Sequence, residues 1–222
     1  MIARELIDTA RVPRGEDMHL YRHDGDFMIV LGNNELMNSR LSGSEIELAT
    51  QTIARLKGRP HIRLLIGGYG MGFTLRAALK VLPADAKVVV VELVEEIIDW
   101  ARGPMAELAA GCLDDPRVEL VMGDVVEEIA NSPGQYDAIL LDVDNGPDGL
   151  TRRDNNKLYS MRGLRASKDA LTAGGVLAIW SAAQDKAFTQ KLRDTHFEVD
   201  EVRVPARSNG KGPKHTIWFA TK

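Results

Sequence analysis

The sequence has a single cysteine and no long apolar run, and each scarcity excludes a class of protein. Cys112 stands alone among 222 residues, so an internal disulfide is excluded and a reducing compartment is favoured. Apolar runs such as Val88–Val91 are far too short to span a bilayer. The first fifteen residues contain acids and lack the apolar core of a signal peptide. We therefore expect a cytoplasmic protein with no membrane partner.

The chain also lacks an excess of basic residues. It has 28 Lys and Arg against 32 Asp and Glu, a formal net charge of −4, which argues against a nucleic-acid partner. The five histidines show neither an H-x-x-H nor an H-E-x-x-H pattern, so we expect no metal. With 44% hydrophobic and 27% charged residues, the composition is that of a globular domain and not of a disordered chain.

After residue 60 the sequence alternates between short β-branched runs and amphipathic stretches. Strands are predicted at residues 62–66, 87–92, 118–122, 136–142, 176–180, 199–204 and 215–220. Helices are predicted at residues 45–56, 73–81, 94–108 with a break near Pro104, 125–131, 162–171 and 183–193. This alternation is typical of an α/β fold, with a Rossmann-like, seven-stranded, mostly parallel sheet that ends in an antiparallel C-terminal hairpin.

The beginning of the chain has a different pattern. Residues 18–38 hold two turn signals, DG at 24–25 and GNN at 32–34, between short β-like runs. Such spacing predicts a small antiparallel hairpin or meander. We therefore divide the chain into a small N-terminal β hairpin region at residues 1–40 and a Rossmann-like domain at residues 41–222.

A glycine-rich turn, GGYGMG at residues 67–72, follows the first strand of this domain. Glycines let the backbone turn sharply into a helix and approach a ligand closely. The spacing is not the G-x-G-x-x-G of a dinucleotide fingerprint, which argues against an NAD-dependent dehydrogenase. Glu92 ends the next strand, 20 residues after Gly72, where a carboxylate can accept hydrogen bonds from both ribose hydroxyls. The alternative for the glycine run is a tight strand-to-helix turn that binds no ligand. The alternative for Glu92 is a carboxylate that is merely solvated.

Two further strand ends carry acids. Asp124 can accept a hydrogen bond from the amine of a base such as adenine, or can cap the helix that begins at Val125. Asp142, Asp144 and Asn145 follow the fourth strand, where a carboxylate can bind or deprotonate a cationic amine. An Asx turn is the alternative there. Ligands of open α/β sheets bind beyond the carboxyl ends of the strands, so these groups are expected at one crevice.

Together these stretches resemble the spermidine synthase (polyamine aminopropyltransferase) family of the S-adenosylmethionine-dependent transferase superfamily. The matching segments, in chain order, are ELMNSRLSGSE, LLIGGYGMG, VVVVELVEEIIDWAR, RVELVMGDVVEEI, YDAILLDVDNGP and LTAGGVLAIW. The resemblance implies a transferase that takes a group from S-adenosylmethionine or decarboxylated S-adenosylmethionine and passes it to a small-molecule acceptor. It also implies a homodimer.

The resemblance assigns roles to individual residues. It implies that Asp142 is the catalytic base or orients the acceptor. The residues that it places on the S-adenosyl ligand are Gly67, Gly68, Gly70, Glu92, Leu93, Asp124 and Val125. The residues that we expect to contact the acceptor are Asp144, Asn145, Tyr69 and Trp180.

Several positions depart from the family pattern. Gly70 and Asn145 stand where the family has acids, and Gly43-Ser44 stands where it has a tyrosine and a histidine. A polyamine needs several carboxylates to offset its desolvation, so these losses argue against putrescine, and Gly70 leaves room for a methionine carboxylate. Three hypotheses follow: aminopropyl or methyl transfer to an amine-type acceptor, methyl transfer from S-adenosylmethionine to a non-polyamine acceptor, and a non-catalytic nucleoside-binding homologue.

A small basic cluster lies in and beside the loop of the C-terminal hairpin. Its members are Arg203, Arg207, Lys211, Lys214 and His215. We expect these side chains to be solvated. Covering an anionic ligand is the alternative.

Overall fold

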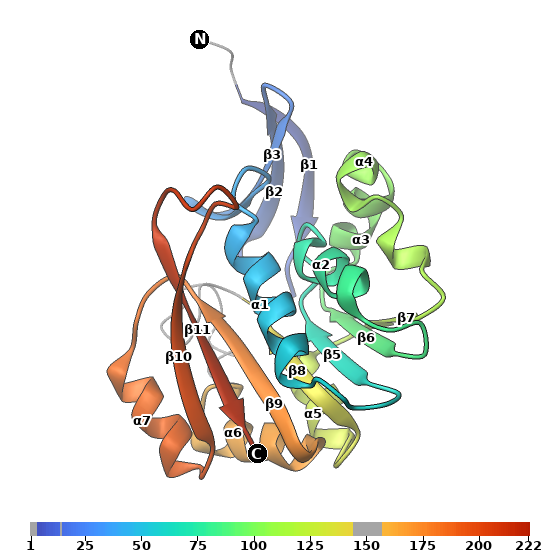
Figure 1. The fold of residues 1–222 in the computed structure, drawn as a ribbon. Helices are drawn as coiled ribbons and strands as arrows, with labels where there is room; N and C mark the ends of the chain where they lie inside the picture. The colour runs from blue at the N-terminus through green and yellow to red at the C-terminus, as the bar shows by residue number, and fades with distance from the viewer. Residues whose placement is uncertain (1–3, 14, 144–156) are drawn as a thin grey trace.

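The structure is a computed structural model that describes residues 4–13, 15–143 and 157–222. Its described strands form two sheets, a small antiparallel one and a larger one (Figure 1). The small sheet has the order β1-β2-β3-β4 and consists of β1 (Glu5–Arg11), β2 (Asp17–His23), β3 (Asp26–Leu31) and β4 (Asn34–Asn38). The predicted hairpin is therefore part of a wider sheet, to which β1 adds an edge strand.

The larger sheet has the strand order β10-β11-β9-β8-β5-β6-β7. Its strands are β5 (Arg63–Gly67), β6 (Lys87–Glu92), β7 (Val118–Met122), β8 (Tyr136–Leu141), β9 (Leu171–Ser181), β10 (Glu198–Pro205) and β11 (Lys214–Thr221). β11 pairs antiparallel with both of its neighbours, and the other pairs are parallel. The predicted seven-stranded, mostly parallel sheet with an antiparallel C-terminal hairpin is confirmed.

Helices cover both faces of this sheet. The helical segments are α1 (Gly43–Arg55), α2 (Phe73–Val81), α3 (Glu95–Arg102), α4 (Ala106–Ala109), the 3₁₀ helix η1 (Cys112–Asp114), α5 (Val125–Asn131), α6 (Met161–Ala170) and α7 (Lys186–Asp194). Side chains of α1, α2 and α3 share one hydrophobic cluster, and those of α5, α6 and α7 share the other. Alternate residues of the strands join opposite clusters, Leu64 one and Leu65 the other, as the two-residue period of a strand requires.

The predicted helix at residues 94–108 is divided, as Pro104 indicated. α3 ends at Arg102 and α4 begins at Ala106, because proline cannot continue the hydrogen-bond ladder of a helix. The predicted helix at residues 73–81 matches α2 at both ends.

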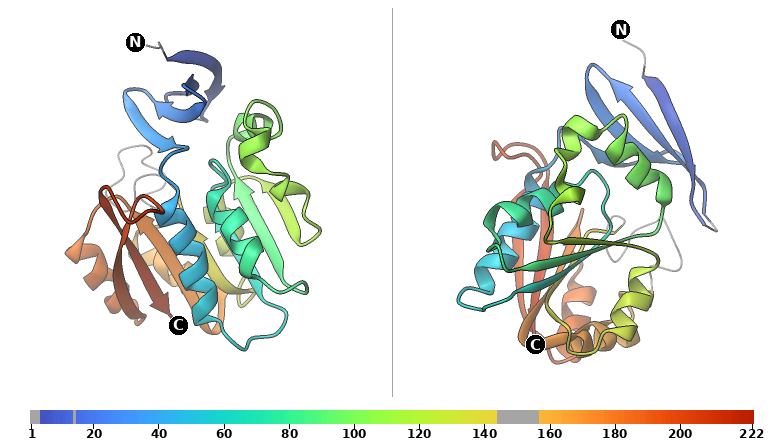
Figure 2. Two further views of the ribbon diagram at one scale, coloured as in Figure 1. Left: turned by 45° about the horizontal axis from the view of Figure 1, so that its top comes forward. Right: turned by 90° about the vertical axis from the view of Figure 1, so that its right-hand side faces the viewer.

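The small sheet stands beyond the end of the large sheet at which the parallel strands finish (Figure 1, Figure 2). The chain passes from β4 into α1, which runs down the front of the large sheet in Figure 1. Trp100 of α3 donates a hydrogen bond from Nε1 to Asp8 of β1 at 2.8 Å, which ties the two parts together. The domain boundary predicted at residue 40 falls between β4 and α1 and stays a prediction.

Candidate active site

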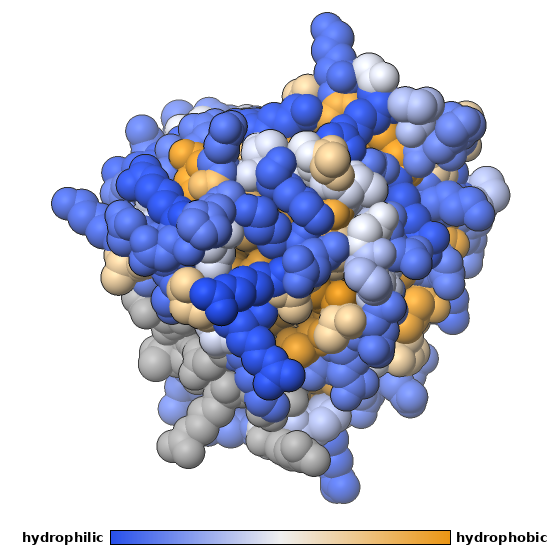
Figure 3. All heavy atoms as spheres, turned by 90° about the horizontal axis from the view of Figure 1, so that it is seen from below, coloured by the Kyte–Doolittle hydropathy of each residue, from blue (hydrophilic) through white to orange (hydrophobic). Residues whose placement is uncertain are grey.

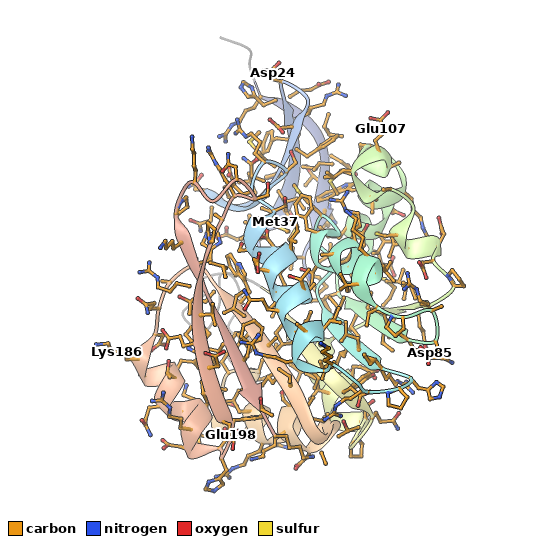
Figure 4. The ribbon with its side chains drawn as sticks, viewed as in Figure 1. Asp24, Met37, Asp85, Glu107, Lys186 and Glu198 are labelled. Atoms are coloured by element: carbon orange, nitrogen blue, oxygen red, sulfur yellow. The ribbon has the colours of Figure 1, made fainter. Side chains whose placement is uncertain are left out.

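A cavity of about 480 Å³ lies where the two sheets meet. Its lining includes side chains of β2, β3 and β4 from the small sheet and the residues that follow β5, β6, β7 and β8 in the large one. Met37, labelled in Figure 4, lies at this junction, just above α1. The volume falls in the range of about 300–1,000 Å³ that small-molecule sites occupy.

The predicted glycine turn borders the cavity and packs tightly on the neighbouring strand ends. Gly68 has a φ of +85°, and a Cβ there would lie 2.9 Å from the carbonyl oxygen of Asp142. Its N–H donates to the carbonyl of Val91 at 2.9 Å. Only glycine combines this backbone angle with so close an approach, so the turn draws the ends of three parallel strands together.

Gly70 borders the cavity beside a methionine of the small sheet. A Cβ at Gly70 would lie 2.4 Å from Sδ of Met37, so the thioether of β4 fills the place beside the turn. Gly70 itself still lines the cavity, and room there for a methionine carboxylate stays a prediction.

Glu92 lines the cavity and also holds the surrounding backbone. Its Oε1 accepts hydrogen bonds from the N–H groups of Leu93 and Val94 at 2.8 and 2.9 Å. Its Oε2 accepts one from the N–H of Tyr69 at 2.9 Å. Burial raises the pKa of Glu92, and these backbone donors oppose that shift. The carboxylate therefore fixes the glycine turn and the start of α3 at the edge of the cavity.

The other residues predicted to hold the nucleoside gather near Glu92. Leu93, Asp124 and Val125 line the cavity, and so do Gly68 and Gly70. Gly67 lies against Val125, since a Cβ at Gly67 would be 2.9 Å from Cγ2 of that valine. Asp124 caps α5 by accepting a hydrogen bond from the N–H of Val126 at 2.9 Å, so the capping alternative is confirmed. The aspartate also borders the cavity, and the two roles are compatible.

Asp142 follows β8 and faces Glu45 of α1 across the cavity lining. Thr74 donates a hydrogen bond to Oδ2 of Asp142 at 3.1 Å. Burial raises the pKa of Asp142 to about 6, and the Thr74 hydrogen bond opposes the shift. Burial and then the charge of Asp142 raise the pKa of Glu45 to about 8. At neutral pH the pair holds one proton and one negative charge.

A histidine from the far end of the chain joins this acidic pair. Ser44 donates a hydrogen bond to Oε2 of Glu45 at 2.6 Å, and its Oγ lies 2.8 Å from Nδ1 of His215. His215 lines the cavity and packs edge-to-face against Trp180, with 4.7 Å between ring centroids. Trp180 is buried and also lines the cavity. An imidazole thus reaches Ser44 from β11.

Some predicted acceptor residues do not reach the cavity, and others cannot be judged. The Tyr69 ring is buried on the far side of the turn, where its hydroxyl lies 3.4 Å from Sγ of Cys112. Its backbone N–H bonds to Glu92, but its side chain does not line the cavity, contrary to the expectation that Tyr69 contacts the acceptor. Asp144 and Asn145 lie outside the described residues.

Sequence reasoning missed Glu45 and His215. Glu45 shares a helical face with Leu48, Ala49 and Thr52, all of which are buried, and an acid on such a face is a detectable signal. His215 gave none, because it comes together with Ser44 across 171 residues of chain. The expectation that His215 is solvated like the rest of its cluster was wrong. Arg203, Arg207, Lys211 and Lys214 are exposed, as expected.

The cavity is strongly acidic in spite of the missing family acids. The carboxyl groups that line it are those of Glu35, Glu45, Glu92, Asp124 and Asp142. Among the described lining residues none is lysine or arginine. Such a lining suits a positively charged ligand and repels an anionic one.

Two further features are absent from the described parts of the chain. No group of three or more His, Cys, Asp and Glu side chains among residues 4–13, 15–143 and 157–222 is arranged to hold a metal ion. None of the described helices has the length and apolar character that a membrane crossing requires.

Comparison with solved structures supports the fold. A spermidine synthase in complex with the transition state analogue AdoDATO superimposes with a TM-score of 0.78 over 98% of this chain and 73% of its own, at 20% identity. The spermidine synthase from Thermotoga maritima gives a TM-score of 0.75 over 98% of this chain and 72% of its own, at 19% identity.

Comparison of sequences identifies the relatives. Polyamine aminopropyltransferase 2 of Pseudomonas aeruginosa is 30% identical over 173 residues, which are 73% of this chain and 47% of the relative. The polyamine aminopropyltransferase of Aeropyrum pernix is 34% identical over 122 residues, 54% of this chain and 37% of the relative. This chain thus spans less than half the length of these curated relatives. The family model for the spermine/spermidine synthase domain matches residues 48–202, and with most of its length in that match the chain belongs to the spermine/spermidine synthase domain family.

Proposed function

We propose that this protein transfers an aminopropyl group from decarboxylated S-adenosylmethionine to an amine acceptor. The observation that carries the proposal is the cavity at the strand ends, lined by five carboxyl groups and by no described lysine or arginine. Both substrates of such a reaction are cations, a sulfonium and an ammonium. The names of the relatives, polyamine aminopropyltransferases, support the same reaction.

We propose that the donor nucleoside binds along the glycine turn. Gly67, Gly68 and Gly70 would let it approach the backbone, and Glu92 would accept a hydrogen bond from the ribose beside the N–H groups that it already holds. Leu93, Asp124 and Val125 would contact the base. The dense set of acceptor oxygens and the cavity volume suit a nucleoside sulfonium.

The charge of the cavity favours the decarboxylated donor over S-adenosylmethionine itself. The intact donor carries a further carboxylate, for which the described lining offers no cationic partner. The thioether of Met37 lies beside Gly70, so the nearest side chain there is apolar and offers that carboxylate no hydrogen-bond donor. A desolvated, unpaired anion among five acids would be strongly unfavourable. This argues for aminopropyl transfer over methyl transfer.

We propose that Asp142 accepts the proton of the attacking amine or orients it. Its raised pKa of about 6 brings its basicity closer to neutral pH than that of an ordinary aspartate. The nitrogen lone pair then forms the new C–N bond to the propyl carbon next to sulfur. The C–S bond breaks at the same time, and its electron pair leaves with the neutral thioether. We propose that Trp180 contacts the acceptor. We propose the same role for Asp144 and Asn145, which lie outside the described residues.

The proposal is tested by incubating the protein with decarboxylated S-adenosylmethionine and a series of diamines. Mass spectrometry should detect methylthioadenosine and an aminopropylated amine in equal amounts. Asp142→Asn should lower turnover on the order of 10²- to 10⁴-fold, the usual contribution of a general base. The matched control is Asp85→Asn, the same change at an exposed site far from Met37 (Figure 4).

Other products would favour other functions. Release of S-adenosylhomocysteine from S-adenosylmethionine would replace the proposal by methyl transfer. Binding of methylthioadenosine in a calorimeter without turnover of any tested amine would indicate a nucleoside-binding homologue. The homodimer and the cytoplasmic location also stay predictions; light scattering on the purified protein and fractionation of cells test them.

A further inference from the structure

The hydroxyl of Ser44 joins two titratable groups that come from opposite ends of the chain. Ser44 is fully buried at the start of α1. Gly43 donates its N–H to the carbonyl of Ala206 at 2.9 Å, and a Cβ at Gly43 would lie 2.5 Å from the carbonyl carbon of Arg207. The β10–β11 loop therefore rests directly on the start of α1, which holds His215 of β11 against Ser44.

A serine hydroxyl has one hydrogen, so the two contacts of Ser44 must alternate in direction. When Glu45 is ionised, Ser44 donates to Glu45 and accepts from Nδ1–H of His215. When Glu45 is protonated, it donates to Ser44, and Ser44 donates to Nδ1 of a histidine whose proton is on Nε2. The two arrangements differ by one proton, and the chain of hydrogen bonds connects them.

Aminopropyl transfer to an ammonium releases one proton in each turnover, so the site needs a path by which this proton reaches the solvent. Asp142 accepts a hydrogen bond from Thr74. In the described parts of the protein, that hydrogen bond does not connect Asp142 to another titratable side chain. Glu45 borders the same cavity and leads through Ser44 to His215, which is only half-buried.

Resting on the proposed function, we propose that Glu45, Ser44 and His215 form a proton relay that carries the released proton out of the acceptor site. In the relay step the O–H bond of Glu45 breaks as the proton passes to Oγ of Ser44. The hydroxyl proton of Ser44 moves to Nδ1 of His215, and the proton on Nε2 leaves to water. Glu45 is then an anion, and His215 is neutral with its proton on Nδ1. Exchange with water returns His215 to the tautomer with its proton on Nε2, and Glu45 can take the next proton.

Protonation of Asp142 favours release of the Glu45 proton. In the resting protein, burial and the charge of Asp142 keep a proton on Glu45 at neutral pH. Once Asp142 takes the proton of the amine, its charge no longer raises the pKa of Glu45, and Glu45 releases its own proton toward Ser44. Burial lowers the pKa of His215. His215 therefore does not retain the proton that it receives. The other titratable groups of the cavity are Glu35 of β4, Glu92 of β6 and Asp124 before α5, and Lys214 precedes His215 on β11 as an exposed cation.

Chemical rescue tests the relay. His215→Ala should lower the turnover number on the order of 10²-fold, and added imidazole should restore it, with more basic substituted imidazoles restoring it more. His215→Phe keeps a ring against Trp180 and should lose as much activity without being rescued. Ser44→Ala should also resist rescue. The matched control His61→Ala alters an exposed histidine paired with Asp85 and should turn over like the wild type.

Two results of this experiment would overturn the relay. One is wild-type turnover by His215→Phe. The other is a folded His215→Ala protein that no imidazole rescues.

A second readout does not depend on turnover. The NMR titration midpoint of His215 should move in both Ser44→Ala and Glu45→Gln, because each removes the link to a titrating carboxyl group. An unchanged midpoint in both variants overturns the relay even if the protein is an active transferase. A shifted midpoint in a protein that transfers nothing would support the hydrogen-bonded array and reject the proposed function alone.

Discussion

Glu92 shows how one side chain can organise a site as well as line it. Three backbone N–H groups from two segments converge on its carboxylate. Hydrogen bonds to a charged acceptor contribute about 1.5–3 kcal/mol each. Loss of that charge should therefore lower both the stability of the fold and the affinity for the proposed ligand.

Glu92→Gln should weaken both the fold and the site. An amide presents an NH₂ group where the carboxylate presents an oxygen, so at least one backbone donor loses its acceptor. We expect the free energy of unfolding to fall by about 1–3 kcal/mol and the affinity for methylthioadenosine to fall with it. Denaturant titration and calorimetry measure the two effects. The control is Glu95→Gln, the same change on an exposed residue of α3; equal losses in the two variants would contradict this role for Glu92.

Glu45→Gln should change how stability depends on pH. The pKa of Glu45 is raised from 4.5 to about 8, so the native state binds its proton more tightly than the unfolded chain. The stability of the wild type should fall as pH rises from 4.5 to 8, by at most about 1.4 kcal/mol per pH unit from this group. The glutamine variant lacks that term, so its advantage over the wild type should grow from pH 5 to 8 and then level off.

Denaturant titrations at several pH values check this expectation. The matched control is Glu47→Gln, two residues further along α1 and outside the cavity lining. An equal trend in the control would show that the effect does not come from the buried pair.

At the residue scale, the sequence predicted the groups that stand at strand ends and missed those that meet through tertiary contact. Glu92, Asp124 and Asp142 follow strands of one parallel sheet, and that topology alone sends them to a common edge. His215 reaches Ser44 only because β11 is inserted between β9 and β10. Local sequence patterns carry no information about a contact between residues that are so far apart in the chain.

Among the elements, α1 is the one that connects the β10–β11 loop to the core of the large sheet. Its first residues touch the β10–β11 loop, and its buried face packs on the large sheet. Gly43 is the point of closest approach, because a Cβ there would meet backbone atoms of Arg207 and Ser208 at 2.5–2.9 Å.

Gly43→Ala should destabilise the protein although alanine favours helices. Intrinsic propensity predicts a gain of about 0.5–1 kcal/mol for this change in a helix, whereas crowding against fixed backbone costs about 1–3 kcal/mol. We expect a net loss in the free energy of unfolding. Gly123→Ala is the control, since a Cβ at Gly123 meets nothing within 4 Å. A stability gain for Gly43→Ala would mean that the loop does not rest on α1 as described.

At the element scale, prediction succeeded where the hydrophobic period was strong. The strands at residues 87–92 and 118–122 match β6 and β7, because their apolar runs are bounded by turn residues. β1 was missed, since its sequence ELIDTAR is mostly exposed at a sheet edge and shows no clear two-residue alternation. The early start of β9 at Leu171 was missed because the Gly174-Gly175 pair reads as a turn.

At the scale of the whole molecule, the cavity lies at one end of the large sheet, between that sheet and the small one. The opposite end, seen in Figure 3, is mostly hydrophilic with smaller hydrophobic areas between the polar side chains. Five acidic side chains line the cavity and no described lysine or arginine does, so negative potential is concentrated where a cationic donor and acceptor would enter.

Because both sheets line the cavity, a bound nucleoside should stabilise both. Hydrogen exchange with saturating methylthioadenosine should slow at amides of β4 and of the turn at residues 67–72, and change little in α7, which contributes no lining residue. A concentration of 100 times the dissociation constant would add about 2.7 kcal/mol to the free energy of unfolding. Slower exchange in the large sheet alone would show that the small sheet takes no part in binding.

The hydrogen bond from Tyr69 to the carboxylate of Glu92 holds the glycine turn in place, and this has a consequence for how the proposed nucleoside would bind. A loop whose shape is already fixed loses little conformational entropy when a nucleoside settles on it, so more of the contact energy remains as affinity. The same rigidity should keep the backbone from yielding to a bulkier sugar or base, so the proposed function predicts that the glycine turn discriminates among nucleosides.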